Sequence, residues 1–145
     1  MPLLNLKSVK LRRAQQLGKI WPRREWVKLM DDAAPVKVLF VCSRNQWHSP
    51  TGEKVWARVS SVSARSAGHN HNARRRLTVA DIRWADLILV MEEKHKSRIR
   101  ADFRDETRFK PLHVLDIPDD YRFMDPELVE IIREKSEALI YGETD

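Results

Sequence analysis

The chain has 145 residues, enough for one domain with its own hydrophobic core, and it carries a net charge of +6. Its single cysteine, Cys42, excludes an intramolecular disulfide. No apolar run is long enough for a transmembrane helix, and the first residues lack the apolar core of a signal peptide. We therefore expect a cytoplasmic protein with no membrane span.

The positive charge is concentrated in residues 1–35. This segment holds eight of the 27 Lys/Arg but only three of the 21 Asp/Glu, a net +5 that leaves +1 for the rest. The uneven distribution argues against nucleic acid as a partner of the remaining chain. Apolar residues at three- and four-residue spacing, Leu11, Ala14 and Leu17, predict a short basic amphipathic helix. We predict a basic N-terminal extension (1–35), either an appendage or a docking element, followed by one domain (36–145).

From Val36 onward, strand and helix patterns alternate regularly. Strands are expected over 36–41, 61–68, 85–91 and 111–117, and helices over 51–59, 77–84, 92–103 and 125–139. This alternation predicts right-handed βαβ crossovers and an α/β fold, with a parallel sheet covered by helices on both faces. The expected helix N-caps are Ser49 or Thr51, Thr78, and Asp125 followed by Pro126.

Cys42 ends the first predicted strand. In parallel sheets, ligands bind at the carboxyl ends of the strands. Backbone N–H groups of the next turn, together with the positive N-terminus of the following helix, can bind a tetrahedral anion such as phosphate or sulfate and favour the thiolate form of a cysteine. A thiolate beside bound phosphate can act as a nucleophile in phosphoryl transfer. From its position alone, Cys42 could equally be a buried packing residue.

The ten residues CSRNQWHSPT (42–51) decide between these roles, because they resemble the phosphate-binding loop of the low-molecular-weight protein tyrosine phosphatases. The family pattern is Cys, five residues, Arg, Ser, Pro, with Asn three residues after the cysteine. The similarity continues through SAG (66–68), WADLILVMEEKHK (84–96) and LDIPDDYRFMDPEL (115–128), and it is closest to a short bacterial branch known as predicted protein tyrosine phosphatases. The family fold, phosphotyrosine protein phosphatase I-like, is a four-stranded parallel sheet flanked by helices, in agreement with the elements above.

The resemblance implies hydrolysis of phosphotyrosine-type monoesters through a cysteinyl-phosphate, without metal or cofactor. Cys42 would be the nucleophile, Ser49 would donate a hydrogen bond to the thiolate, and Asn45 would brace the loop. The expected substrate is a phosphorylated protein or a small aryl phosphate. The phosphate- and substrate-binding residues would be Ser43, Arg44, Asn45, Gln46, Trp47 and Ser49, with Tyr121. Trp47 and Tyr121 would flank an aromatic leaving group, although Trp47 could also be a packing residue.

The resemblance places the general acid in DIPDDY (116–121). Asp119 aligns with the family's catalytic aspartate, and it would protonate the leaving oxygen and then activate water. Asp120 occupies the place of the usual proline, so either carboxyl could serve. An Asp-rich turn after a strand is also ordinary turn chemistry.

His48 stands where the family has its signature arginine. Arginine is always charged and binds two phosphoryl oxygens with a planar fork, whereas imidazole is shorter and carries a charge only in acid. Catalysis should therefore fall more than anion binding. Three interpretations follow: a weakened phosphatase in which protonated His48 assists catalysis, a pseudophosphatase that serves as a phospho-ligand binding or interaction module, or an accidental or engineered substitution. A fourth is a thiol–imidazole pair of Cys42 and His48, as in cysteine hydrolases, but the loop favours an anion.

Other residues with possible chemistry lie outside these motifs. His69 and His71 lack a third ligand at suitable spacing, so no metal site is expected. The three arginines at 74–76 are expected to form a solvated rim near the anion site. Arsenate reductases share the fold, but they need additional cysteines, so the single thiol argues against that activity.

Overall fold

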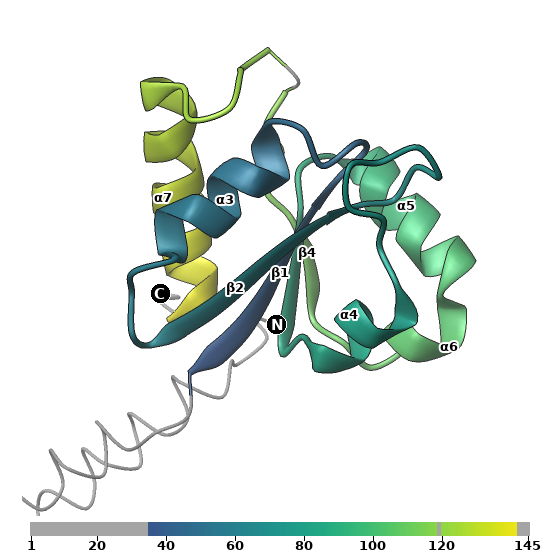
Figure 1. The fold of residues 1–145 in the computed structure, drawn as a ribbon. Coiled ribbons are helices and arrows are strands. Elements are labelled where there is room, and N and C mark those ends of the chain that lie inside the picture. The colour runs from purple at the N-terminus through teal and green to yellow at the C-terminus, as the bar shows by residue number, and fades with distance from the viewer. Residues whose placement is uncertain (1–34, 119, 142–145) are drawn as a thin grey trace, which may run out of the picture.

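The computed structural model describes residues 35–118 and 120–141, so the predicted basic N-terminal helix and Asp119 lie outside the described residues. Four parallel strands form one sheet in the order β2-β1-β3-β4 (Figure 1). The strands are β1 (Val36–Cys42), β2 (Val62–Gly68), β3 (Leu87–Val90) and β4 (Leu112–Val114). The sheet confirms the predicted α/β class.

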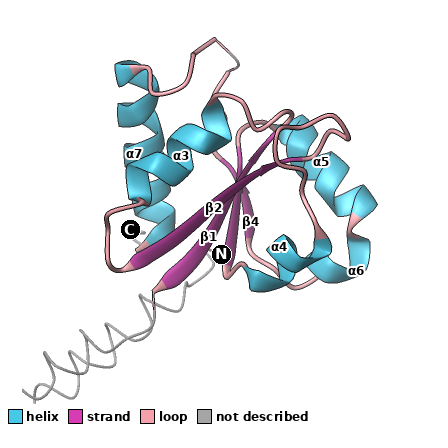
Figure 2. Ribbon diagram, in the orientation of Figure 1, coloured by secondary structure: helices cyan, strands magenta, loops and turns pink. Residues whose placement is uncertain are grey.

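Helices cover both faces of the sheet, as Figures 1 and 2 show. On one face lie α3 (His48–Trp56) and α7 (Pro126–Ile140); on the other lie α4 (Val79–Trp84), α5 (Glu93–Asp102) and α6 (Arg104–Thr107). Alternate residues of β1 enter the two layers: Phe40 packs with the α3 and α7 cluster, and Leu39 and Val41 with the opposite cluster. From Val38 to Cys42 both faces of β1 are therefore buried, which explains the apolar sequence there; Lys37 is the one exposed residue of the strand. Within residues 35–118 and 120–141, no helix is both long and apolar enough to cross a membrane.

The helix after β1 differs from the prediction. It begins at His48 instead of residue 51, and its N-cap residue is Trp47, whose side chain makes no capping bond. The prediction that Ser49 or Thr51 caps this helix was wrong. Ser49 Oγ lies 2.9 Å from Cys42 Sγ, and Thr51 Oγ1 donates to the Trp47 carbonyl oxygen at 2.6 Å. Both hydroxyls lie inside the helix and are used by other partners.

The remaining boundaries follow the sequence pattern more closely. Thr78 caps α4 with a reciprocal bond to Asp81, and Asp125 caps α7, whose first residue is Pro126, as predicted. The helix expected over 92–103 is α5, and the short α6, which was not predicted, follows it after Phe103.

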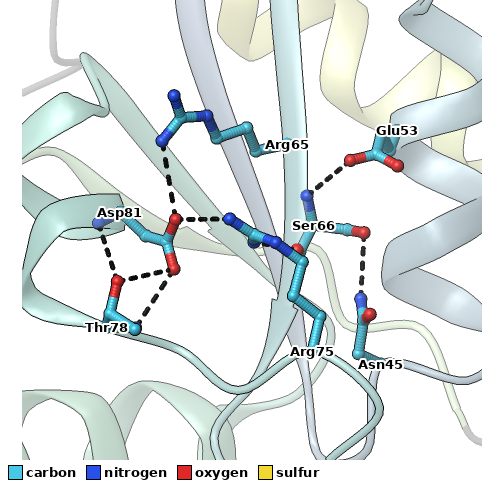
Figure 3. Close-up of polar contacts among 7 residues, drawn as sticks. All are labelled: Asn45, Glu53, Arg65, Ser66, Arg75, Thr78 and Asp81. Atoms are coloured by element: carbon cyan, nitrogen blue, oxygen red, sulfur yellow. Dashed lines mark hydrogen bonds and ion pairs between the residues drawn. The ribbon is translucent and has the colours of Figure 1, made fainter.

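Asp81 is a buried carboxylate that links α4 to the segment after β2 (Figure 3). Its Oδ1 accepts a hydrogen bond from Arg75 Nη2 at 2.7 Å, and its Oδ2 accepts from the Thr78 backbone N at 3.1 Å and the Thr78 hydroxyl at 3.0 Å. Burial raises the pKa of Asp81, but the hydrogen bonds from Arg75 and Thr78 outweigh burial and hold the pKa below its ordinary value of 3.8. The ionised form therefore stabilises the fold.

We expect Asp81→Ala to lower the free energy of unfolding at pH 7 by about 2 kcal/mol, mostly because the Asp81 carboxylate no longer accepts hydrogen bonds from Thr78 at the start of α4. The ion pairs add less, because the Arg65 and Arg75 side chains are 41% and 43% exposed. Since the folded pKa of Asp81 is lowered, its ionic contribution is complete above pH 3.8 and is lost as pH falls through the folded pKa, so the difference from wild type should narrow in strong acid. Urea unfolding measures this difference in the free energy of unfolding.

Asp102→Ala is the control, because it removes an exposed ion pair with Arg98 and should lower the free energy of unfolding by less than about 0.5 kcal/mol. Equal losses of stability in Asp81→Ala and Asp102→Ala would contradict the prediction.

Candidate active site

The loop that follows β1 is built around Asn45. Its φ of 56° lies in the left-handed region, which asparagine tolerates better than most residues and which turns the chain sharply. Its side chain is fully buried, and Nδ2 donates to Ser49 Oγ and to Ser66 Oγ, each at 2.9 Å. Figure 3 shows Asn45 beside Ser66 of β2. The buried amide therefore fastens the middle of the loop to the neighbouring strand.

The sulfur of Cys42 lies between two polar neighbours. The backbone N–H of Asn45 donates to Sγ at 3.2 Å, and Ser49 Oγ is 2.9 Å from Sγ. Ser49 Oγ is also 3.4 Å from the Ala67 carbonyl oxygen, but a thiolate can only accept, so in that form Ser49 donates along the shorter contact. The sulfur therefore lies within reach of two hydrogen-bond donors, the Asn45 N–H and the Ser49 hydroxyl.

A cavity of about 440 Å³ opens above this sulfur. Six of the residues that the sequence analysis assigned to the site line it, namely Cys42, Ser43, Arg44, Gln46, Trp47 and His48. Asn45 and Ser49 are fully buried behind the lining. Nearly the whole predicted loop is therefore arranged around one concave surface at the carboxyl end of β1.

His48 is the first residue of α3, and it is only 4% exposed. It lines the cavity together with Cys42, six residues before it in the chain. The first turn of a helix carries unsatisfied N–H groups and a partial positive charge. An anion in the cavity would thus meet the helix terminus and the imidazole.

Solved structures similar to this chain share its architecture. Wzb of Vibrio vulnificus, in complex with benzylphosphonate, is 25% identical, with 74% of this chain and 99% of that chain covered and a TM-score of 0.60. The low-molecular-weight protein tyrosine phosphatase of Streptococcus pyogenes is 18% identical (76% and 94% covered; TM-score 0.62). The YwlE arginine phosphatase of Geobacillus stearothermophilus is 23% identical, with 73% of this chain and 88% of that chain covered and a TM-score of 0.55. The fold is that of the low-molecular-weight protein tyrosine phosphatases.

That fold confirms the resemblance read from 42–51. No protein-family model matches the sequence, and no curated protein sequence matches it. Within the phosphatase fold, the cavity lies where the strand-to-helix loop meets its neighbouring loops.

Three lining residues were missed by the sequence analysis, namely Asn70, Glu92 and His95. Asn70 follows β2, and Glu92 and His95 follow β3, the two strands that flank β1. Ligand sites of parallel sheets gather at the carboxyl ends of adjacent strands. The polar residues directly after these two strands were therefore the signal that could have identified them.

The segment after β2 braces the loop that follows β1 from outside. Arg74 Nε donates to the Asn45 carbonyl oxygen at 3.0 Å, and the Asn70 backbone N donates to the Ser43 carbonyl oxygen at 3.0 Å. A Cβ atom on Gly68 would lie 2.7 Å from that same Ser43 oxygen, so β2 can approach the loop only with glycine there. The arginines at 74–76 are exposed, as expected for a rim, but Arg74 is also a brace.

Asp120 and Tyr121 are the candidate site residues of the second predicted loop that the structure describes. Asp120 is exposed, and Tyr121 is half-buried against the core cluster of β1, α3 and α7. Neither residue lines the 440 Å³ cavity. The predicted contacts of these two residues with a leaving group stay predictions.

Proposed function

We propose that this protein hydrolyses phosphotyrosine-type monoesters through a cysteinyl-phosphate on Cys42. The observation that carries the proposal is the position of the Cys42 sulfur, which lines the cavity while accepting from Asn45 N and lying 2.9 Å from Ser49 Oγ. The phosphatase fold and the benzylphosphonate bound to Vibrio vulnificus Wzb support a phosphoryl ligand. Benzylphosphonate has the shape of an aryl phosphate, the substrate class proposed here.

In the proposed first step, the Cys42 thiolate attacks phosphorus. A sulfur–phosphorus bond forms as the bond from phosphorus to the leaving oxygen breaks, and a carboxyl of the 119–120 pair protonates that oxygen. In the second step, the same carboxylate takes a proton from water, whose oxygen attacks phosphorus. The sulfur–phosphorus bond breaks, and inorganic phosphate and the thiolate are released.

The loop and His48 would stabilise charge on the phosphoryl oxygens during both steps. Phosphoryl transfer depends mainly on positioning and electrostatic stabilisation. The helix terminus at His48 is in place for this role, while the imidazole offers fewer donors than a guanidinium. We therefore propose a phosphatase whose turnover is reduced by His48.

Trp47 supports an aromatic leaving group. Its side chain is 38% exposed although it is large and apolar, and it lines the cavity. Exposed indole rings bind flat apolar partners by stacking. A phenyl ring attached to the bound phosphoryl group would cover this surface.

Trapping of the intermediate tests the proposal. We expect acid quenching during turnover of 4-nitrophenyl phosphate to leave one phosphoryl group on a peptide that contains Cys42, detected by mass spectrometry. Cys42→Ala is the control instead of Cys42→Ser, because a YwlE mutant whose active-site cysteine is replaced by serine carries a phosphoryl group on that serine. Steady turnover without a phosphorylated cysteine would contradict the mechanism, and a phosphorylated Cys42→Ala protein would place the nucleophile elsewhere.

A further inference from the structure

His95 and Ser43 form a hydrogen-bonded pair on the wall of the cavity. Ser43 follows Cys42 in the loop, and His95 lies in the first turn of α5. His95 Nε2 is 3.0 Å from Ser43 Oγ, and the Glu92 backbone N is 3.0 Å from His95 Nδ1. A backbone N–H can only donate, so Nδ1 accepts and carries no hydrogen. In neutral imidazole the hydrogen must then be on Nε2, which donates to Ser43.

The surroundings of His95 keep its ring neutral. The side chain is 3% exposed; its burial, followed by the charges of His69, Lys94 and His48, lowers the pKa of His95 to about 4. The His69 ring packs against it, with centroids 5.1 Å apart. Near neutral pH the tautomer that is set by the Glu92 N–H is therefore maintained.

The direction of this bond determines what Ser43 can do. Because Ser43 Oγ accepts from His95, its own hydrogen is left for another acceptor. Among residues 35–118 and 120–141, Ser43 Oγ makes no hydrogen bond besides that with His95, and Ser43 lines the cavity. An oxygen of a bound ligand is the acceptor that this arrangement suits.

We propose that His95 is a positioning residue that turns the Ser43 hydroxyl hydrogen into the cavity, where Ser43 donates to an oxygen of the phosphoryl ligand. The inference rests on the proposed function for the identity of the ligand. The Ser43 hydroxyl, next to Cys42 in the chain, would be an additional neutral hydrogen-bond donor to the ligand. This matters at a site where His48 offers fewer hydrogen-bond donors than an arginine would. The donor depends on α5, because Glu92 and His95 together set the ring tautomer.

Substitutions at both positions test the inference through benzylphosphonate affinity and through KM and kcat for 4-nitrophenyl phosphate. We expect Ser43→Ala and His95→Leu each to weaken the Kd for benzylphosphonate by about three- to tenfold, the effect of one hydrogen bond. His95→Gln should retain near wild-type affinity, because Oε1 can accept from Glu92 N while Nε2 donates to Ser43. Ser97→Ala, an exposed position of α5, is the matched control and should change nothing.

A double-mutant cycle separates positioning from general stability. If His95 acts through Ser43, then His95→Leu has no further effect on Kd in the Ser43→Ala protein. Three results would each overturn the inference. The first is that the losses of affinity in Ser43→Ala and His95→Leu are fully additive, the second is that His95→Gln binds as weakly as His95→Leu, and the third is that the Kd of Ser43→Ala is unchanged. Ser43→Ala removes one oxygen atom only, so its Kd decides the matter even if His95→Leu fails to fold.

The outcomes distinguish this inference from the proposed function. If the losses of benzylphosphonate affinity in Ser43→Ala and His95→Leu are coupled but no phosphorylated Cys42 is trapped, the hydrolytic mechanism is wrong and the role of Ser43 as a donor stands. If the phosphorylated intermediate is trapped during turnover but the losses of affinity are additive, the proposed role of Ser43 and His95 is wrong and the hydrolytic mechanism stands. No benzylphosphonate binding by the native protein would overturn both.

Discussion

Cys42→Ala is expected to abolish hydrolysis of 4-nitrophenyl phosphate, with a fall in kcat of at least about 10⁴-fold. The sulfur lines the cavity beside Asn45 N and Ser49 Oγ, and alanine offers no lone pair to attack phosphorus. The loop should keep its shape, because Asn45 is held by Ser49, Ser66 and Arg74 as well as by the sulfur. Anion binding should therefore survive.

The same variant is expected to bind benzylphosphonate at least as tightly as the native protein. Removing a thiolate removes a negative charge next to the anion, so the Kd should stay equal or decrease. Isothermal titration calorimetry measures the Kd, and initial rates measure kcat. Ser49→Ala is the informative companion, because it retains the sulfur and removes one donor, and we expect a smaller loss in kcat of about 10- to 100-fold. Substantial turnover by Cys42→Ala would end the assignment of the nucleophile.

His48→Arg is expected to raise kcat for the same substrate by about 10²–10³-fold, the effect typical of one preorganised charge-stabilising donor. The guanidinium carries a permanent charge and can bind two phosphoryl oxygens at once, with most of its benefit in the transition state. Position 48 borders the cavity at the first residue of α3, so a longer side chain there can reach the anion. KM should change less than kcat.

Gln46→Arg is the matched control for this gain. Position 46 also lines the cavity, so the variant adds the same charge to the same wall without placing it at the helix terminus. We expect a change in kcat of less than about tenfold, since a surface charge attracts the substrate without gripping the transition state. Equal gains in the two variants would attribute the effect to charge alone. An inactive but folded His48→Arg protein would contradict the phosphatase function itself.

Much of the fold was predictable because its determinants are local. The apolar residues of β1 indicated a strand buried on both faces, and Thr78 and Asp125 with Pro126 marked the starts of α4 and α7. These signals depend on the periodicity and capping chemistry of neighbouring residues. The loop motif at 42–51 is also contiguous, so six cavity-lining residues could be named before the structure was considered.

Contacts between distant segments were outside the reach of that reasoning. Ser66 is an ordinary polar residue of a strand by its sequence, but in the fold its Oγ accepts from Asn45 Nδ2, 21 residues earlier in the chain. Arg74 belonged to an ordinary basic run until the turn after β2 brought it to the Asn45 carbonyl. In each case a tertiary partner replaced the role that local sequence favours.

By itself, the amino-acid sequence determined the alternation of strands and helices and the position of Cys42 at the end of a strand, because both depend on the periodicity and capping chemistry of neighbouring residues. The tertiary structure decided what surrounds the sulfur. The order β2-β1-β3-β4 places β3 beside β1, so His95 meets Ser43 across 52 residues of chain, and Asn70 and Glu92 reach the same cavity. Strand order depends on the packing of both helical layers, and only that packing brings these three residues to the cavity that Cys42 lines.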